Sequence, residues 1–441
     1  MKAIIVPGVT DLNKGDQALV WESHRLISDS GRFEQILILE NGDTPEENKK
    51  LCEQSQKKGF RFAESILKHP RRGKHSNNEH IRDSYVNTLR MIANSLMDFM
   101  ANSLLLILCN KSWLVKVIYS KKTYEGVKKF EQSDVVFVKG GGFIHSYGGL
   151  TSTYSIWYSL FYIKLAKRLN KIVVVLPNSY GPFDGFLVKK QVSSALANVD
   201  LLLARESVSA SQLGDLLDKT IKRGPDLGFF LEPQVSDRVD ETLSDHGLQD
   251  KQNLVGITVR PWRFPNDKSS FDRFELYIKT IKEFCLYLIS NGYHPVLCNQ
   301  AMGPNLHEDD RVAISKVVSG LKGADEYTWI NENFTCEETK YLYSKLYSLV
   351  GTRFHSVIFS LSSNVPVISI GYGGNKSKGI MNDLGLLDYH IDIESSNLTE
   401  LIQMFEKVET NYEHIKATLL SNMGHVESSR REMLAHIVAL S

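Results

Sequence analysis

The chain of 441 residues carries 52 Lys and Arg against 51 Asp and Glu, and 42% of its residues are hydrophobic. This length exceeds one ordinary hydrophobic core, and the near-neutral charge excludes a general affinity for nucleic acid. Five scattered cysteines without a C-x-x-C pair exclude a disulfide framework and indicate a reducing compartment.

Short apolar runs alternate with turns and helical patterns in the first half of the chain. The apolar run of residues 2–6 is too short for the core of a signal peptide, so we interpret it as the first strand. We expect further strands over residues 134–139, 172–176 and 201–205, and an aromatic-rich helix over residues 154–169. Continuous Val, Ile and Leu runs are typical of parallel strands covered on both faces.

The segment from about 43 to 125 has little strand signal, so we predict a helical insertion there. Residues 104–109 are continuously apolar, but Asp98, Lys111 and Lys116 interrupt the wider window. One interpretation is a buried helix or helical hairpin. The other is a surface that touches a bilayer, favoured by the basic run of residues 68–74 and by Lys121 and Lys122. The sequence leaves both open.

The second half repeats the alternation of strand and helix. We expect strands over residues 254–259, 294–298, 348–350 and 366–370, and an amphipathic helix over residues 271–290. The polar segment 233–252 marks a domain boundary. We therefore predict an α/β protein of two doubly wound Rossmann-like domains facing across a cleft, residues 1–235 and residues 236–441, the second ending in C-terminal helices.

Two glycine-containing segments follow strands of the predicted first domain, where ligands bind in open α/β sheets. Residues 8–18 open a helix at about Asp16, so Asn13 and Asp16 either cap that helix or bind an anion or sugar hydroxyls. The glycines 140–142 with His145 form either a sharp turn or a loop that lets a ligand approach the backbone.

Cationic side chains follow strands of the predicted second domain. Arg260 is placed to bind a carboxylate or phosphate, and a surface salt bridge is the alternative. Arg353 lies where a helix begins, which favours an anion site, and His355 can exchange a proton there. Lys376 follows the next strand and either adds positive charge to the same pocket or is a solvated lysine.

These motifs, in this order, resemble those of the polysaccharide pyruvyl transferase family. The matching elements are N-K-G-D of residues 13–16, V-K-G-G-G of 138–142, G-P of 181–182, A-R-E of 204–206, P-D of 225–226, G-I-T-V-R of 256–260, R-F-H of 353–355, Pro366 and Lys376. His145 departs from the family, which often has an acidic residue after the glycine run.

The resemblance implies a glycosyltransferase-B-like fold and a transferase of cell-envelope or exopolysaccharide biosynthesis. It implies transfer of pyruvate from phosphoenolpyruvate to a sugar of a polysaccharide or lipid-linked oligosaccharide, with formation of a ketal and release of phosphate. Phosphoenolpyruvate is then a co-substrate, and neither a cofactor nor a metal is expected. The C-terminal domain would bind this donor and the N-terminal domain the glycan acceptor.

The same resemblance, together with position in the sequence, gives each candidate residue an expected role. His355 is the expected acid. The other candidates are Arg260, Arg353, Phe354 and Lys376 for the donor, and Asn13, Asp16, Gly141, Gly142 and His145 for the acceptor or its loops.

Two other functions stay open at this point. One is a nucleotide-sugar-dependent glycosyltransferase of the same two-domain shape, and the other is a non-catalytic binding subunit in glycan assembly. We expect a cytoplasmic protein with no nucleic-acid partner, and peripheral contact with the inner membrane face if the bilayer interpretation holds.

Overall fold

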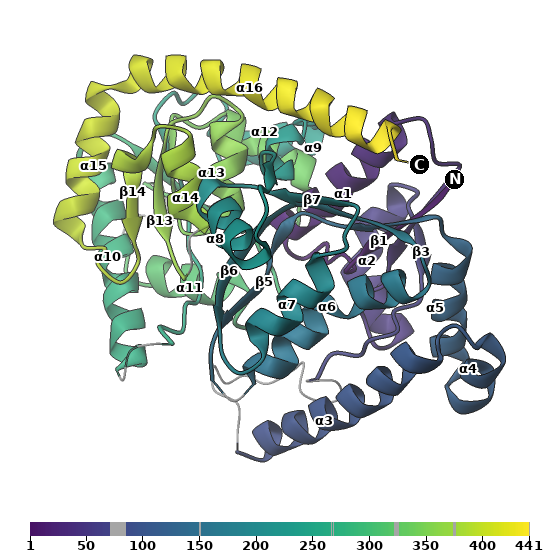
Figure 1. The fold of residues 1–441 in the computed structure, drawn as a ribbon. Coiled ribbons are helices and arrows are strands. Elements are labelled where there is room, and N and C mark those ends of the chain that lie inside the picture. The colour runs from purple at the N-terminus through teal and green to yellow at the C-terminus, as the bar shows by residue number, and fades with distance from the viewer. Residues whose placement is uncertain are drawn as a thin grey trace. The chain divides into compact units, whose positions relative to one another are not determined.

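The chain folds into two compact units (Figure 1). The computed structural model describes residues 1–70, 85–149, 151–265, 267, 269–321, 326–373 and 376–440. Unit 1 comprises Met1–Asp11, Leu19–Leu227 and Ser429–Ser441, and unit 2 comprises Leu12–Ala18 and Gly228–Ser428.

Unit 1 is built on a parallel sheet whose strands follow the order β3-β2-β1-β4-β6-β7-β8, with β5 paired to β6. The strands are β1 Lys2–Val6, β2 Gln35–Leu39, β3 Arg61–Ala63, β4 Val135–Val138, β5 Gly141–Tyr147, β6 Ile172–Asp184, β7 Leu201–Ala204 and β8 Lys222–Arg223. Ile4 of β1 lies between Leu37 and Val136 of its neighbours. All three side chains are buried, as expected for the apolar runs at the centre of a parallel sheet.

Helices cover this sheet. They are α1 Lys14–Asp29, α2 Pro45–Lys57, α3 Tyr85–Leu108, α4 Ser112–Ile118, α5 Lys121–Gln132, α6 Ser152–Arg168, α7 Val188–Leu196 and α8 Ser207–Leu217. The helix α6 packs against β5 and α7, and its buried residues Trp157, Leu160 and Phe161 join the core of the sheet. The aromatic-rich pattern at residues 154–169 is therefore a core helix.

Unit 2 has a parallel sheet with the order β11-β10-β9-β12-β13-β14. Its strands are β9 Leu254–Thr258, β10 His294–Cys298, β11 Thr328–Ile330, β12 Ser348–Gly351, β13 Val367–Gly371 and β14 His390–Asp392. Its helices are α9 Asp237–Asp245, α10 Ser270–Ser290, α11 Asp310–Val318, α12 Cys336–Ser344, α13 Phe354–Leu361, α14 Lys376–Asp383, α15 Leu398–Thr410 and α16 Tyr412–Val438, with 3-10 turns at Leu227–Phe230 and Leu387–Tyr389. The part of α16 from Ser429 onward belongs to unit 1. If the six strands are numbered as they occur in the chain, their order across the sheet is 3-2-1-4-5-6, which is the Rossmann order.

The division into units differs from the predicted one in two places. The boundary lies after Leu227 instead of residue 235, because the segment that follows packs in unit 2, where the Leu231 carbonyl accepts a hydrogen bond from Lys340. The segment Leu12–Ala18 also belongs to unit 2. Its Leu12 carbonyl accepts from the Met302 N–H at 2.7 Å, and the Lys14 N–H donates to the Gln300 carbonyl at 3.0 Å.

The predicted insertion 43–125 is only partly an insertion. The strand β3 extends the sheet of unit 1 by pairing with β2, so that Phe62 lies opposite Ile38. The sequence prediction missed β3 because it has three residues and begins with a charged one. All five cysteines are free and buried.

Candidate active site

The candidate donor-binding residues lie at the carboxyl ends of two neighbouring strands of unit 2. The strands β9 and β12 pair in parallel, and the strand order reverses between them. Arg260 follows β9 by two residues, and Arg353 follows β12 by two residues. Ligands of open α/β sheets bind at this point of strand reversal. The sequence therefore delivers two guanidinium groups to the place where this fold binds its ligands.

Arg353 is buried and held by carboxylates. Its Nε donates to Asp310 Oδ1 at 2.7 Å, and its Nη1 donates to Glu308 Oε2 at 3.1 Å. Asp310 is fully buried and also accepts from the N–H groups of Gln300 and Ala301. Burial raises the pKa of Asp310 to about 6, although Arg353 and the backbone donors oppose that rise. At neutral pH Asp310 is therefore ionised and fixes the guanidinium in one position.

Arg260 is stacked on aromatic rings. Its guanidinium carbon lies 4.1 Å from the ring centroid of Tyr372 and 5.0 Å from that of Trp262. Its Nη2 lies 3.5 Å from Glu308 Oε1. Stacking holds the guanidinium plane, and it leaves the edge of the fork available for an anion.

Glu308 joins the two arginines. One carboxylate oxygen contacts Arg260 and the other contacts Arg353. Burial would raise the pKa of Glu308, but Arg353 and Arg260 outweigh it and hold that pKa below its ordinary value. The two guanidinium groups thus already hold one carboxylate, which is the kind of group that a small anionic ligand presents.

His355 lies in the first turn of α13, against the N-terminal turn of α1. A Cβ added to Gly15 would lie within 3.0 Å of the His355 ring, so only glycine fits there. The Asn13 side chain accepts hydrogen bonds from the N–H groups of Gly15 and Asp16, at 3.0 and 3.3 Å. Asn13 therefore caps a helix that begins at Lys14, and Asp16 lies in its first turn.

This arrangement changes the predicted grouping of the candidates. Asn13 and Asp16 were expected on the acceptor side in the N-terminal domain. Both belong to unit 2, together with Arg353 and His355. The reason is the segment Leu12–Ala18, which pairs with residues after β10 through an antiparallel bridge between Asn13 and Ala301.

Lys376 and Phe354 adjoin the arginines in unit 2. The Nζ of Lys376 lies 5.5 Å from the ring centroid of Phe354, and Phe354 directly follows Arg353. The Phe354 ring is buried. The Lys376 ammonium group therefore lies at the start of α14, over the ring of the residue that follows Arg353.

Gly141, Gly142 and His145 belong to unit 1. They were expected in a turn or loop, but they form the strand β5, which pairs with β6 through register shifts. A Cβ on Gly142 would lie 2.7 Å from Arg205 Nη2, so glycine here makes room for that side chain. Burial lowers the pKa of His145, and the nearby Arg205 lowers it further. The imidazole is therefore neutral near pH 7.

Arg205 explains another part of the motif set. Its Nη1 donates to Asp226 Oδ2 at 2.6 Å, and both side chains are fully buried. The A-R-E and P-D elements of the sequence thus meet as an ion pair in unit 1. The buried pair lies next to Gly142 of β5.

Sequence reasoning missed the partners of the two arginines. These are Glu308, Asp310, Trp262 and Tyr372. A usable signal was present, because the acidic run of residues 308–310 follows β10 and opens α11, with Asp309 as the capping residue. Among the described residues, no group of three or more His, Cys, Asp or Glu side chains is arranged to hold a metal ion.

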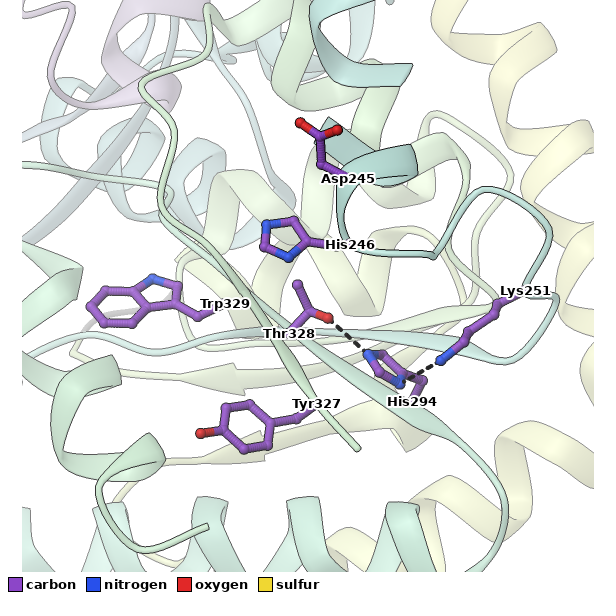
Figure 2. A pocket seen from close by; sticks show the side chains of 7 residues that line it. All are labelled: Asp245, His246, Lys251, His294, Tyr327, Thr328 and Trp329. Carbon is purple, nitrogen blue, oxygen red and sulfur yellow. Dashed lines mark hydrogen bonds between the residues drawn. The ribbon is translucent and has the colours of Figure 1, made fainter. Parts of the chain in front are cut away.

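A cavity of about 470 Å³ lies at the amino ends of the strands of the unit 2 sheet, opposite the carboxyl ends that the two arginines follow (Figure 2). His294 and Thr328, which begin β10 and β11, line it together with Lys251. Figure 2 shows His294 between the other two, bonded to Thr328 Oγ1 at 2.9 Å and to Lys251 Nζ at 3.1 Å. Burial, assisted by Lys251, lowers the pKa of His294 to about 4. We place the candidate site at the carboxyl edge instead, because the paired guanidinium groups lie there.

Comparison with known proteins identifies the family of the chain. Residues 13–374 match the family described as polysaccharide pyruvyl transferase. The amylovoran biosynthesis protein AmsJ of Erwinia amylovora is 27% identical over 298 residues, which cover 65% of this chain and 68% of AmsJ.

Solved structures are similar in fold at low identity. The Anabaena protein HepE in complex with UDP-glucose has a TM-score of 0.52 at 10% identity, with both chains fully covered. The Arabidopsis thaliana protein UGT89C1 in complex with UDP has a TM-score of 0.56 at 9% identity over 99% of each chain. The fold is thus glycosyltransferase-B-like, with two parallel-sheet α/β domains, as predicted.

Proposed function

Because the chain belongs to the polysaccharide pyruvyl transferase family, we propose that it moves pyruvate from phosphoenolpyruvate onto a sugar and closes a ketal. A pyruvyl transfer role in polysaccharide synthesis follows from the family and agrees with the similarity to AmsJ. The observation that carries the finer proposal is the Glu308 carboxylate held between Arg260 and Arg353.

The donor suits this pair of arginines. Phosphoenolpyruvate presents a carboxylate and a phosphate on one small molecule, so its site needs at least two cationic groups. In our proposal one of these anionic groups takes the position of the Glu308 carboxylate, and Lys376 neutralises part of the remaining charge. Phe354 positions Lys376 by the contact of its ring.

His355 supplies the proton in this scheme. It protonates the methylene carbon of phosphoenolpyruvate, which leaves an oxocarbenium-like centre at the adjacent carbon. A first sugar hydroxyl adds to that carbon. The C–O bond to phosphate then breaks, and a second hydroxyl closes the ring. The two hydroxyls release two protons, of which one replaces the proton given to the methyl group and the other leaves with phosphate.

The turn that contacts His355 is suited to the acceptor. Asn13 and Asp16 border Gly15, which packs against the imidazole. Amide and carboxylate oxygens accept hydrogen bonds from sugar hydroxyls. We propose that these two side chains orient the acceptor hydroxyls, and separately that Gly141, Gly142 and His145 bind glycan in unit 1.

The test combines phosphate release with product mass. Phosphoenolpyruvate and a panel of free and lipid-linked saccharides are incubated with the protein, and the masses of the products are measured by mass spectrometry. We expect acceptor-dependent phosphate release and a sugar heavier by one pyruvate less one water. Release of UDP from UDP-glucose, without turnover of phosphoenolpyruvate, would instead support the glycosyltransferase alternative.

Variants assign the roles. His355→Ala is expected to lower turnover by about 10²–10⁴-fold, the usual contribution of a general acid, while donor binding persists. The control is His414→Ala, an exposed histidine on α16 of the same unit. Wild-type turnover of the His355 variant would remove this histidine from the chemistry.

A further inference from the structure

The helix α3 exposes its apolar face instead of burying it. Seven of its exposed apolar side chains lie along one stripe, most of them three or four residues apart, and each is between 44% and 64% exposed: Leu89, Ile92, Leu96, Met97, Met100, Leu104 and Ile107. From Leu89 to Ile107 this apolar stripe runs for about 27 Å. A helix on the surface of a soluble protein shows the reverse pattern, with its apolar stripe facing the core.

Four polar residues on the opposite side of α3 are less exposed than this stripe. Asn94, Ser95, Asp98 and Asn102 are all only partly exposed, and the Asn94 side chain donates to the Pro70 carbonyl at 3.0 Å. The same side of the helix is anchored to α6, because Phe99 packs on Trp157 with ring centroids 4.9 Å apart. Leu105 is fully buried beneath. The unit thus holds α3 by its polar and C-terminal side and presents the apolar stripe outward.

The next helix continues the apolar surface and adds positive charge. On α4, Trp113, Val117 and Ile118 are exposed, with Trp113 at 68%. Figure 1 shows α4 next to the end of α3, at the margin of unit 1. Between Asp98 and Glu125 the chain carries no further acidic residue, but it carries Lys111, Lys116, Lys121 and Lys122. All but Lys122 are exposed.

These features specify one kind of partner. Isolated apolar side chains on a surface are ordinary, whereas a continuous stripe of this length marks an interaction site. Lysines beside the stripe favour a negatively charged surface, and an exposed tryptophan is typical of the bilayer interface. We propose that unit 1 binds the surface of an anionic lipid bilayer through the apolar stripe of α3 and the lysines around α4.

In this proposal α3 lies in the plane of the membrane. Leu89–Leu108 is long and apolar enough to cross a bilayer, and it is the one such helix among the described residues. Its other side is nevertheless packed on α6, which belongs to the core of unit 1. A helix with one apolar and one occupied side fits an interfacial position, with the stripe at the boundary of headgroups and acyl chains. Of the basic run 68–74, residues 71–74 lie outside the described residues.

Vesicle flotation tests this inference without reference to enzymatic activity. The full chain is mixed with vesicles of phosphatidylcholine alone or with phosphatidylglycerol added, and the bound fraction is measured. We expect binding to the anionic vesicles that weakens with salt. The triple variant Leu96→Ser, Met100→Ser and Leu104→Ser should lose more than tenfold in partitioning. The matched control replaces three exposed apolar residues of unit 2 with Ser, namely Val235, Leu276 and Leu420.

Charge is tested separately. Lys111→Ala combined with Lys116→Ala should lower binding to anionic vesicles by about fivefold per lysine and leave any binding to neutral vesicles unchanged. Lys49→Ala with Lys50→Ala, two exposed lysines on α2, is the control. Because all the apolar positions are exposed, each variant should melt at the wild-type temperature.

Three results would overturn the proposal. The first is a wild-type protein that stays unbound, or a triple serine variant that floats like the wild type. The second is a wild-type dimer that the triple variant converts to a monomer, since a second copy would then cover the stripe. The third is resistance of the membrane-bound protein to extraction by alkaline carbonate, which would indicate a spanning helix.

Discussion

Replacing Glu308 with Gln should tighten the binding of the donor. Glu308 holds the space between Arg260 and Arg353, so an anionic donor has to compete with its carboxylate. The substitution removes one negative charge and keeps the shape of the side chain. Arg353 remains anchored, because Asp310 and the Glu308 main-chain carbonyl still accept its hydrogen bonds. The site should therefore stay folded while its net charge becomes more positive.

The size of the effect follows from Coulomb repulsion between the carboxylate and the donor. Two like charges at about 4 Å repel by about 1 kcal/mol in water and about 4 kcal/mol at an effective dielectric constant of 20. The Glu308 side chain is 38% exposed, which favours the lower part of this interval. At about 1–2 kcal/mol, the KM for phosphoenolpyruvate should fall by about 5–30-fold, with little change in kcat.

Steady-state kinetics and donor titration measure this change. The matched control is Glu275→Gln, since Glu275 is 39% exposed and pairs with Lys316 at 2.7 Å elsewhere in unit 2. A KM that rises in the Glu308 variant would mean that the carboxylate positions the arginines and does not compete with the donor. An unchanged KM would mean that the donor binds away from both arginines.

Three further changes probe unit 2. Asp310→Asn should lower the free energy of unfolding of unit 2, measured in urea, by about 3–5 kcal/mol, because it removes the buried one of the two carboxylates that hold the Arg353 guanidinium. Gly15→Ala should lower kcat by displacing the His355 ring, whereas Gly424→Ala, where a Cβ meets nothing within 4 Å, should leave kcat unchanged. Neutral His294 contributes up to about 3 kcal/mol to the free energy of unfolding. This contribution is complete above pH 6.5 and is lost as the pH falls through about 4. His294→Asn should flatten this acid dependence in thermal melts, and an unaltered pH profile would contradict the assignment.

The sequence predicted the central strands well because their signal is local. The run of residues 2–6 is β1, and the run of residues 294–298 is β10, with the same bounds. Both are continuous apolar segments that end at a turn. Edge strands were missed where the chain is short or mixed, as in β8, which consists of Lys222 and Arg223. Such a strand exists because β7 offers it backbone partners, and that is a property of the tertiary fold.

Of the residues in the candidate site, only the cationic ones could be predicted from the sequence. Arg260 and Arg353 follow apolar strands, and this position can be identified in a sequence. Glu308 and Asp310 follow β10, which makes them candidates for the same edge of the sheet, but their contact with Arg353 depends on the tertiary fold. The assignment of Asn13 to unit 2 was beyond prediction for the same reason, since it depends on a bridge to Ala301 that joins residues 288 positions apart.

The two arginines differ in how firmly they are held, and this difference separates their tasks. Arg353 gives two nitrogens to the buried Asp310 at 2.7 Å, so its guanidinium is part of the frame of unit 2. Arg260 has one contact of 3.5 Å to Glu308, and its buried Nε has no hydrogen-bond partner among the described residues. Arg260 can therefore turn toward a donor within the plane that Tyr372 and Trp262 hold, while the hydrogen bonds of Arg353 prevent such a turn. Replacing Arg260 with Lys should consequently raise KM and leave stability unchanged, whereas replacing Arg353 should destabilise unit 2 before any effect on donor binding can be measured.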